Sequence, residues 1–462
     1  MTKPAKFSLP RKPHYVSLAA DIDVFLLFKK IEKQFDNCFI LESLGEDSHI
    51  ARHSIIGFDP EYQLYANGKQ LNIAHRDGNV ESYDSVNPYY LLREIMPQDV
   101  ISRMYCGGLT GYLGYDAMNY FEPSLDIQSS EMFDAFRFGL FKDGLVFDKM
   151  TGELFYFYYD DNRIEIVEQL LAQEYAGNGE LAIEDLGDTM TREEHAEAVA
   201  KVKQNIIDGK IFQCEVGFKR KLKVQGDTIN LYEALREVNP SPQMYYMKFG
   251  EQKVIGASPE LLFRLRQGEM ETYPLAGTTK RGANAEEDMQ LARKLLNDPK
   301  EIAEHNMLVD LHRNDIGRVA RFGTVKVRSL MDIKRFSHVQ HISSEIVGII
   351  DEKHDMFSAL ASNFPAGTLT GAPKIEAMKI INGQENDGRG PYGGALGHFS
   401  FNGDCTFAIP IRTVFANGED GYVQTCGGNV YDSNPADEYE EIRRKFAGTQ
   451  KVLARFIKES SQ

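Results

Sequence analysis

The amino-acid sequence predicts an α+β protein. Short alternating segments separated by turn residues run through the first 160 residues, which is typical of antiparallel strands. Beyond them, helical and strand patterns mix without the regular strand–helix–strand repeat of a parallel sheet. Between the two regions lies an acidic stretch punctuated by glycine, residues 174–190, which predicts a domain boundary. We therefore expect two domains, residues 1–187 and residues 188–456.

The first elements follow from local patterns. Residues 61–83 read as short strands joined by turns at "NGK" and "RDGN", and residues 144–161, "GLVFDKMTGELFYFYYDD", predict a further hairpin. "TREE" at residues 191–194 is a capping box, which predicts a helix that ends before Gly209. Residues 210–224, "KIFQCEVGFKRKLKV", alternate in the manner of a strand.

A helix capped by Asp298 and started by Pro299 carries the first pair of carboxylates that could do chemistry. Glu301 and Glu304 lie on one face of it, together with leucines, so this face is expected to be buried. Glu301 could instead complete a capping box with Asp298, a role for which Glu304 lies too far along. A buried carboxylate is normally paired or bound to a metal ion.

The second pair lies on a helix near the C-terminus, in "NPADEYEEIRRKFAG". Asn434 suits the cap, and Gly448 is expected to end the helix. Glu438, Glu441 and Lys445 fall within roughly 60° of one another, beside the apolar stripe. The stripe could be a solvated flank. Alternatively, the two pairs could converge on one divalent cation, and ligands that are all oxygen favour Mg²⁺.

Composition narrows the possible partners and location. A net charge of −16 argues against nucleic acid or an anionic membrane as partner. There is no apolar run of membrane-spanning length and no apolar signal core at the N-terminus, so we expect a cytoplasmic protein. Five scattered cysteines predict reduced thiols. The sequence has no P-loop, dinucleotide-binding glycine motif, nucleophile elbow or zinc-protease motif.

Longer segments carry a resemblance to a known family. "EIAEHNMLVDLHRNDIGRV", "SHVQHISSEIVG", "FPAGTLTGAPKIEAM", "GPYGGALGHFSF" and "AIPIRTV" occur in the order seen in the chorismate-utilising enzymes. These include anthranilate synthase component I, aminodeoxychorismate synthase component I, and isochorismate and salicylate synthases. "ILES", "RHSIIGFDPE" and "GGLTGYLGYD" resemble the N-terminal domain of the first two. The resemblance implies large antiparallel sheets packed against each other and flanked by helices, in two intertwined lobes: a regulatory-type domain and a chorismate-binding domain.

The resemblance also implies a binding site for Mg²⁺ and for chorismate, a dicarboxylate. Glu304 and Glu441 resemble direct Mg²⁺ ligands, and Glu301 and Glu438 resemble their supporting or water-mediated partners. The residues that resemble substrate contacts are Ala276, Gly277, Thr278, Tyr392, Arg412, Cys426, Gly427, Gly428 and Lys445. Cys426 departs from the family's G-x-G pattern, because it replaces the first glycine and adds bulk where the backbone meets substrate.

Two positions bear on the branch of the family. Relatives that add water carry a lysine base where this chain has Gln213, and many aminodeoxychorismate synthases carry a lysine nucleophile where it has Ala276. Glutamine cannot deprotonate water but tolerates ammonia, which is already a nucleophile. Both positions therefore favour the anthranilate synthase branch. A 2-amino-2-deoxyisochorismate synthase, an aminodeoxychorismate synthase component I and an inactive ligand-binding relative are the alternatives.

The implied reaction adds ammonia at C2 of chorismate while the C4 hydroxyl leaves, with Glu260 as general acid. His341, with Thr368 nearby, resembles the residue that supports the later loss of pyruvate. No glutaminase motif is present, so ammonia is expected from a separate glutamine amidotransferase subunit.

A regulatory site is implied by two further segments. Glu42 and Ser43 of "ILES", with Asn239, Pro240, Ser241 and Met244 of "NPSPQM", resemble the family's tryptophan-binding segments. Feedback inhibition by tryptophan is therefore expected. The alternative is that "NPSP" is only a turn after a helix.

Overall fold

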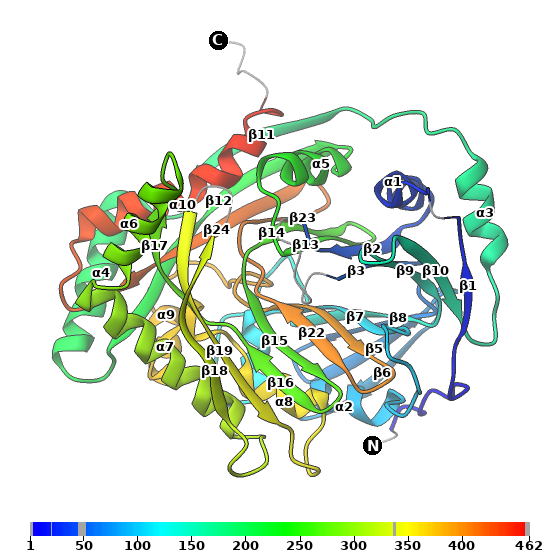
Figure 1. The fold of residues 1–462 in the computed structure, drawn as a ribbon, viewed down its shortest axis with the longest axis horizontal. Helices are drawn as coiled ribbons and strands as arrows, with labels where there is room; N and C mark the ends of the chain where they lie inside the picture. Colours follow the sequence, from blue (N-terminus) through cyan, green and yellow to red (C-terminus); the bar gives the residue numbers. More distant parts are fainter. Residues whose placement is uncertain (1–2, 20, 45–51, 336–338, 458–462) are drawn as a thin grey trace.

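The computed structural model describes residues 3–19, 21–44, 52–335 and 339–457. Within these residues the chain forms two antiparallel sheets of 12 strands each, and both are visible in Figure 1. In spatial order, the first sheet contains β1 (His14–Ser17), β10 (Glu153–Tyr158), β9 (Gly144–Asp148), β3 (His53–Phe58), β2 (Asn37–Glu42), β13 (Gln243–Phe249), β14 (Gln252–Ser258), β23 (Thr413–Asn417), β24 (Asp420–Asn429), β12 (Gln213–Gly226) and β11 (Leu181–Asp188), with β20 (Gly371–Ala372) beside β12.

The second sheet packs against the first. In spatial order it contains β17 (Leu275–Lys280), β19 (Val339–Ile349), β16 (Glu269–Thr272), β15 (Leu261–Arg266), β22 (Cys405–Ala408), β21 (Ala395–Ser400), β7 (Gly108–Leu113), β8 (Phe136–Phe141), β4 (Tyr62–Asn67), β5 (Gln70–His75) and β6 (Val80–Asp84), with β18 (Lys326–Arg335) beside β19. Phe39 of the first sheet and Phe141 of the second meet between the sheets, with ring centroids 4.8 Å apart.

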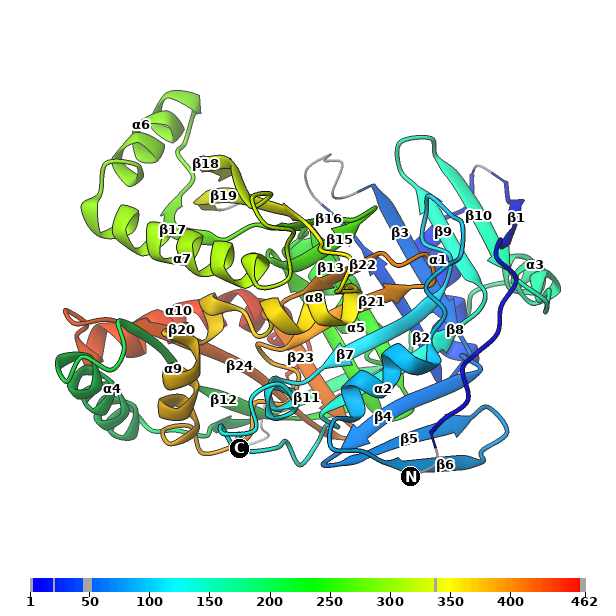
Figure 2. The same ribbon diagram turned by 90° about the horizontal axis from the view of Figure 1, so that it is seen from below.

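Helices cover the outer faces and one end of the two sheets. They are α1 (Val24–Gln34), α2 (Pro88–Ile95), α3 (Ile164–Ala172), α4 (Arg192–Ile207), α5 (Ile229–Val238), α6 (Ala285–Leu295), α7 (Pro299–Gly317), α8 (Met356–Asn363), α9 (Lys374–Asn382) and α10 (Pro435–Leu453), with short 3₁₀ turns η2 (Tyr115–Tyr120) and η3 (Gly367–Leu369). Helices α4, α6, α7, α9 and α10 gather on one side of the molecule (Figure 2). The expected α+β fold of packed antiparallel sheets is confirmed.

Both sheets contain strands from the two halves of the chain. In the first, β2 pairs with β13, so that Glu42 lies opposite Met244. In the second, β7 pairs with β21, so that Gly111 lies opposite Gly397. The stretch expected to separate two domains contains β11, which pairs with β12 along most of its length. The proposed boundary at residue 187 therefore falls inside a strand, and the lobes are intertwined.

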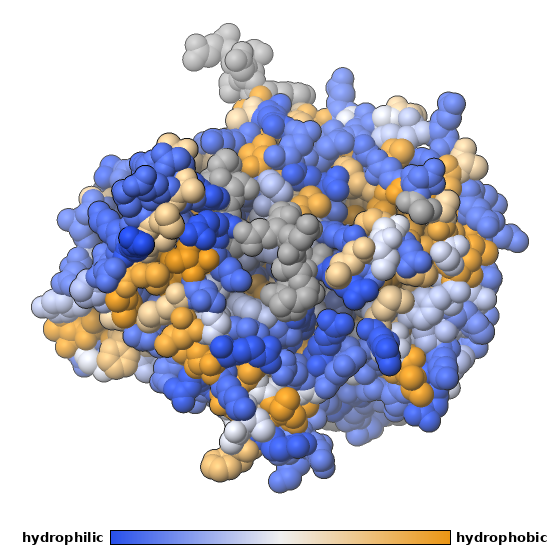
Figure 3. Space-filling view, viewed as in Figure 1, coloured by the Kyte–Doolittle hydropathy of each residue, from blue (hydrophilic) through white to orange (hydrophobic). Residues whose placement is uncertain are grey.

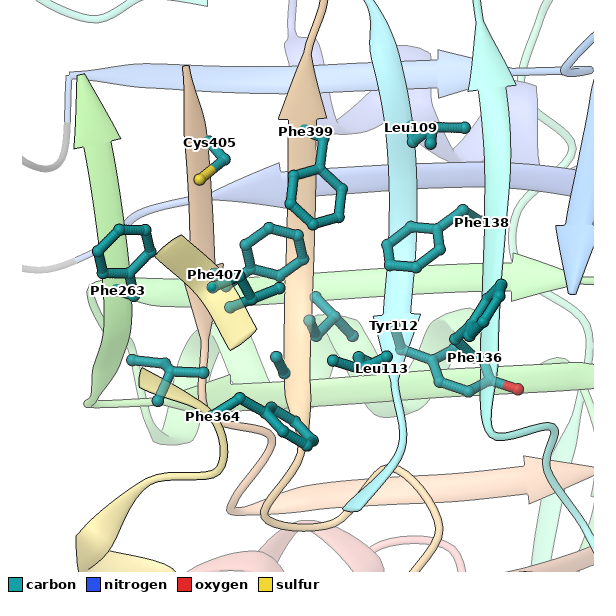
Figure 4. Packing of buried hydrophobic residues seen from close by; sticks show 14 of the residues in the cluster. Leu109, Tyr112, Leu113, Phe136, Phe138, Phe263, Phe364, Phe399, Cys405 and Phe407 are labelled. Carbon is teal, nitrogen blue, oxygen red and sulfur yellow. The ribbon is translucent and has the colours of Figure 1, made fainter. Parts of the chain in front are cut away.

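Aromatic side chains dominate the core against the second sheet. Figure 4 shows buried residues of β7, β8, β15, β21 and β22, and Tyr112 of β7 reaches Gln252 of the first sheet. Phe399 stacks on Phe357 of α8 with ring centroids 4.3 Å apart, and Phe407 lies 4.7 Å from Phe399. This core includes Leu262, Phe263 and Leu265 of β15, the strand that follows the predicted site residue Glu260.

The local predictions compare well with the structure. The hairpins β4–β5–β6 and β9–β10, the capping box at Thr191 and the strand β12 are all confirmed. The five cysteines are buried and free, as expected. No helix in the described part of the chain is long and apolar enough to cross a membrane. The face shown in Figure 3 is mostly hydrophilic, with hydrophobic patches around α6 and α7.

Candidate active site

The first carboxylate pair lies on α7, which packs on β17 and β19. The Asp298 side chain caps the helix by accepting from the backbone N–H groups of Lys300 (2.9 Å) and Glu301 (3.4 Å). The Asp298 N–H itself donates to the Leu295 carbonyl, so Glu301 does not complete a capping box. A Cβ at Gly277 of β17 would lie 2.8 Å from Glu301 Oε2. Glu301 therefore faces β17, beside a predicted substrate contact.

The second pair lies on α10, which begins after the cap Asn434. The helix does not end at Gly448, as predicted, but continues to Leu453. The reason is that Val452 and Leu453 extend the buried apolar face of the helix into the core, so stopping at Gly448 would forfeit that burial. Lys445 Nζ contacts Glu441 Oε1 and the Cys426 carbonyl oxygen, each at 2.9 Å.

All four glutamates share one electrostatic environment. Burial raises the pKa of Glu301, Glu438 and Glu304, the last to about 7, and the Glu441 carboxylate adds to each of these shifts. Glu438 Oε2 is buried without a hydrogen-bond partner. Carboxylates of like charge in one protein pocket are stabilised by a shared cation.

The donor set fits Mg²⁺ in its chemistry. An orphaned carboxylate oxygen and neighbouring oxygen donors are what a hard divalent cation requires. However, within residues 3–19, 21–44, 52–335 and 339–457, no three histidine, cysteine, aspartate or glutamate side chains come close enough together to hold a metal ion. Helix α10 packs on β24 and α4, whereas α7 packs on the other sheet. The Mg²⁺ site thus stays a prediction.

Glu260 lies in the connection between β14 and β15 and is 6% exposed. Thr368 of η3 donates a hydrogen bond to Glu260 Oε1 at 2.8 Å. Burial raises the pKa of Glu260 to about 7, although the Thr368 hydroxyl and the nearby Arg412 guanidinium oppose the shift. Burial in turn lowers the pKa of Arg412. A carboxyl group with this pKa is partly protonated at neutral pH and can serve as a general acid.

His341 of β19 lies against β17. Its Nδ1 is 3.0 Å from Thr278 Oγ1 and 3.2 Å from the Gly277 carbonyl oxygen. Gly277 has a φ of 66°, a conformation that glycine adopts without strain and that turns this carbonyl toward the histidine. Burial, assisted by Arg412, lowers the pKa of His341 to about 4. The imidazole is therefore neutral at physiological pH.

Gln213 and Cys426 meet on the neighbouring strands β12 and β24. Between them lies Glu215, a buried carboxylate that the sequence analysis missed. Its Oε1 accepts from Gln213 Nε2 at 3.0 Å, and its Oε2 accepts from the Cys426 thiol at 3.3 Å. Tyr392 donates to Cys426 Sγ at 3.1 Å. The bulk added by Cys426 is thus accommodated by Glu215 and Tyr392.

A signal for Glu215 was present in the sequence. Successive side chains of a strand alternate between its two faces, so Gln213 and Glu215 had to share one. The other two predicted substrate contacts in this part of β24, Gly427 and Gly428, lie where only a residue without a side chain fits easily. A Cβ at Gly427 would lie 3.3 Å from Glu438 Oε2, and one at Gly428 would lie 2.6 Å from Glu215 Oε1. Ala276 is buried opposite Ile342 on β19.

The structure thus arranges the predicted residues in two groups. One lies at the end of the second sheet and contains Glu260, Gly277, Thr278, His341, Thr368 and Arg412. The other lies on β12, β24 and α10 and contains Gln213, Tyr392, Cys426, Gly427, Gly428 and Lys445. The Glu215 carboxylate links them, because it accepts hydrogen bonds from Gln213 and Cys426 of the second group and its charge raises the pKa of Glu260 in the first.

The predicted effector residues lie elsewhere, where β2 pairs with β13. Glu42, Ser43 and Met244 line a cavity of about 150 Å³ that extends to Tyr105 and Arg264. The Glu42 carboxylate already accepts hydrogen bonds from Tyr232 and Arg236 of α5, each at 2.8 Å. The Ser43 carbonyl accepts from Lys149.

The second effector segment packs directly on the first. Asn239 caps the C-terminus of α5, so the segment does form a turn after a helix. Pro240 follows, and the Ser241 carbonyl accepts from the Leu44 N–H at 2.8 Å. Pro242 and Gln243 line the cavity, whereas the predicted effector residues Asn239, Pro240 and Ser241 are not among its lining residues.

Comparisons with known proteins agree with the sequence motifs. The family profile described as chorismate binding enzyme matches residues 36–451. Anthranilate synthase component 1 of Leptospira biflexa is 51% identical over 455 residues, covering 97% of each chain. The protein of that name from Methanothermobacter thermautotrophicus is 42% identical over 429 residues, covering 93% of this chain and 92% of the relative.

Solved structures show the same architecture. The crystal structure of anthranilate synthase component I from Streptococcus pneumoniae aligns with a TM-score of 0.75 and 31% identity, covering 87% of this chain and 93% of that one. The menaquinone-specific isochorismate synthase of Escherichia coli aligns with a TM-score of 0.75 at 17% identity, covering 98% and 96% of the two chains. The latter similarity concerns the fold alone.

Proposed function

Because the chain belongs to the family of chorismate-binding enzymes, we propose that it converts chorismate and ammonia to anthranilate and pyruvate, the first step of tryptophan biosynthesis. The observation that carries the proposal is the Glu260 constellation: a buried acid with a pKa of about 7, held by Thr368 and facing Arg412. Two curated relatives that cover nearly the whole chain carry the name anthranilate synthase component 1.

Substrate binding is assigned to the cationic groups of the site. Lys445 and Arg412 hold the carboxylates of chorismate, together with backbone N–H groups of the β24 loop. Burial lowers the pKa of Lys445, but the negative charges of Glu215 and Glu441 have the larger effect and raise that pKa. The ammonium group therefore stays charged. Glu301, Glu304, Glu438 and Glu441 would hold Mg²⁺, which when bound would neutralise a substrate carboxylate.

The proposed reaction first uses Gln213 and Glu260 and then His341. Ammonia adds at C2 beside Gln213, whose amide offers no base for activating water. Glu260 donates a proton to the C4 hydroxyl, which leaves as water. The neutral imidazole of His341 then accepts the C2 proton as pyruvate is eliminated and the ring becomes aromatic.

Further components of the proposal concern partners and regulation. Ammonia would come from a separate glutamine amidotransferase subunit, in keeping with the relatives' designation as component 1. Tryptophan would bind in the cavity beside Glu42 and Ser43 and act through a shift between two arrangements of the lobes. The five free cysteines suit the reducing cytoplasm, where we place the enzyme.

The decisive experiment supplies chorismate, Mg²⁺ and an ammonium salt and follows anthranilate fluorescence and pyruvate release together. Equal amounts of both products, dependent on ammonium and abolished by a chelator, are expected. Isochorismate or salicylate formed without ammonium would refute the proposal. An amino product that forms without pyruvate would identify a 2-amino-2-deoxyisochorismate or aminodeoxychorismate synthase instead.

A further inference from the structure

Glu215 is a buried carboxylate that forms no salt bridge in the described part of the chain, although the more distant Lys445 ammonium group lowers its pKa. Glu215 is 6% exposed. Arg389 approaches it but donates only to the Glu215 backbone carbonyl, because its guanidinium is paired with Glu385 at 2.7 Å. Lys445 is paired with Glu441. An ionised carboxylate buried without a cation costs several kcal/mol, so this position is suited to a bound cation.

A buried acceptor beside the Glu215 carboxylate lacks a hydrogen-bond donor. Gln213 is 3% exposed and its Oε1 is buried without a hydrogen-bond partner, while its Nε2 donates to Glu215. Buried side-chain oxygens are normally hydrogen-bonded. The neighbouring strand β24 carries Gly428 where it passes closest to these two side chains. A Cβ atom at Gly428 would lie 2.6 Å from Glu215 Oε1 and 2.7 Å from Gln213 Nε2. The Gln213 amide oxygen therefore lacks a donor directly beside the Glu215 carboxylate, where the neighbouring strand carries glycine.

The chemistry of the pair selects the ligand. A small cation that donates several hydrogen bonds satisfies a carboxylate and an amide oxygen together, and ammonium has four N–H donors and one positive charge. A divalent metal ion would require further oxygen ligands in a defined geometry, and the other side chain at hydrogen-bond distance from the carboxylate is the Cys426 thiol.

We infer that Gln213 and Glu215 together bind the nitrogen nucleophile as an ammonium ion and that Glu215 accepts one of its protons. This inference rests on the proposed function, since it concerns the ammonia used there. One N–H bond of ammonium breaks and one O–H bond forms on Glu215. The N–H bonding pair remains on nitrogen as the lone pair of neutral ammonia, which then attacks C2. The ion pair becomes two neutral groups, so no oxidant or further reactant is needed.

The test separates the Michaelis constants of the two substrates. Initial rates of anthranilate formation are measured against ammonium chloride and against chorismate, at constant ionic strength, for the wild type, Glu215→Gln and Glu215→Asp. Glu184→Gln is the matched control, because Glu184 lies exposed on the adjacent strand β11. The KM for ammonium should rise about tenfold or more in Glu215→Gln, the loss expected for one charge-assisted hydrogen bond. The KM for chorismate should stay within about twofold.

Each other outcome has a definite meaning. A rise in both Michaelis constants, or an unchanged KM for ammonium, would show that Glu215 only supports the fold of the site and would overturn the inference. A raised Mg²⁺ requirement with unchanged ammonium dependence would make Glu215 a metal ligand and would also overturn it. If Glu215→Gln does not fold, Glu215→Asp decides by the same comparison. A wild type that makes no anthranilate from ammonium would instead refute the proposed function.

Discussion

Replacing Thr368 by valine should shift the pH at which the enzyme loses activity. In the proposed mechanism Glu260 donates a proton and must be protonated, so kcat/KM for chorismate should fall about tenfold per pH unit above its pKa of about 7. The Thr368 hydroxyl donates to the carboxylate at 2.8 Å, and a hydrogen bond to the charged form lowers a pKa. Valine keeps the shape of threonine but removes the donor. The pKa of Glu260 should therefore rise.

The size of the shift follows from the strength of this bond. A hydrogen bond to a charged group contributes about 1.5–3 kcal/mol, and one pKa unit corresponds to about 1.4 kcal/mol. The alkaline limb of the pH profile should thus move upward by about 1–2 units. Because ammonia also ionises in this range, the informative quantity is the ratio of variant to wild-type kcat/KM at each pH.

A matched control and a refuting result are available. Thr151→Val, in the exposed turn between β9 and β10, should leave the profile unchanged. An alkaline limb that stays in place in Thr368→Val, or that moves to lower pH, would show that Glu260 is not the acid whose ionisation limits the rate.

Three further predictions concern the metal site, the second chemical step and regulation. Glu441→Gln should lower turnover by at least about 100-fold without lowering the melting temperature by more than a few degrees, and unchanged activity at limiting Mg²⁺ would contradict the metal assignment. His341→Ala should slow pyruvate release more than chorismate consumption, so that mass spectrometry detects an amino intermediate. Equal loss of both rates would remove His341 from the second step. Ser43→Phe places a ring in the 150 Å³ cavity and should relieve inhibition by L-tryptophan at an unchanged basal rate. Calorimetry that detects no tryptophan binding to the wild type would refute the effector site.

The sequence predicted helix starts correctly, because an N-cap depends only on residues close together in the chain. The caps at Thr191, Asp298 and Asn434 all form, because a side-chain oxygen satisfies N–H groups within three residues. The predicted end of α10 at Gly448 was wrong, because the length of this helix depends on residues far apart in the chain. Burial of Val452 and Leu453, which depends on the tertiary fold, outweighs the preference of glycine for helix ends.

The sequence did not reveal which strands pair when they lie far apart in the chain. The stretch at residues 174–190, which the sequence predicts to be a domain boundary, contains β11, which forms there because β12 offers it a partner edge. The site residues came from motifs, whereas the contact of Glu215 with Cys426 arises only because β12 and β24 lie side by side. The neighbours that perturb Glu260 likewise come from separate parts of the chain.

The mixed strand order of the two sheets has a consequence for biosynthesis of the protein. Cys106 and Ser400 are neighbours in space although they are 294 residues apart in the sequence. While the chain emerges from the ribosome, the edges of β2 and β7 lack their partners until β13 and β21 have been made. Contacts of such high sequence separation slow folding, and unpaired edges invite aggregation. The nascent chain therefore completes its second sheet only once β22 has been made, and until then its unpaired strand edges are exposed.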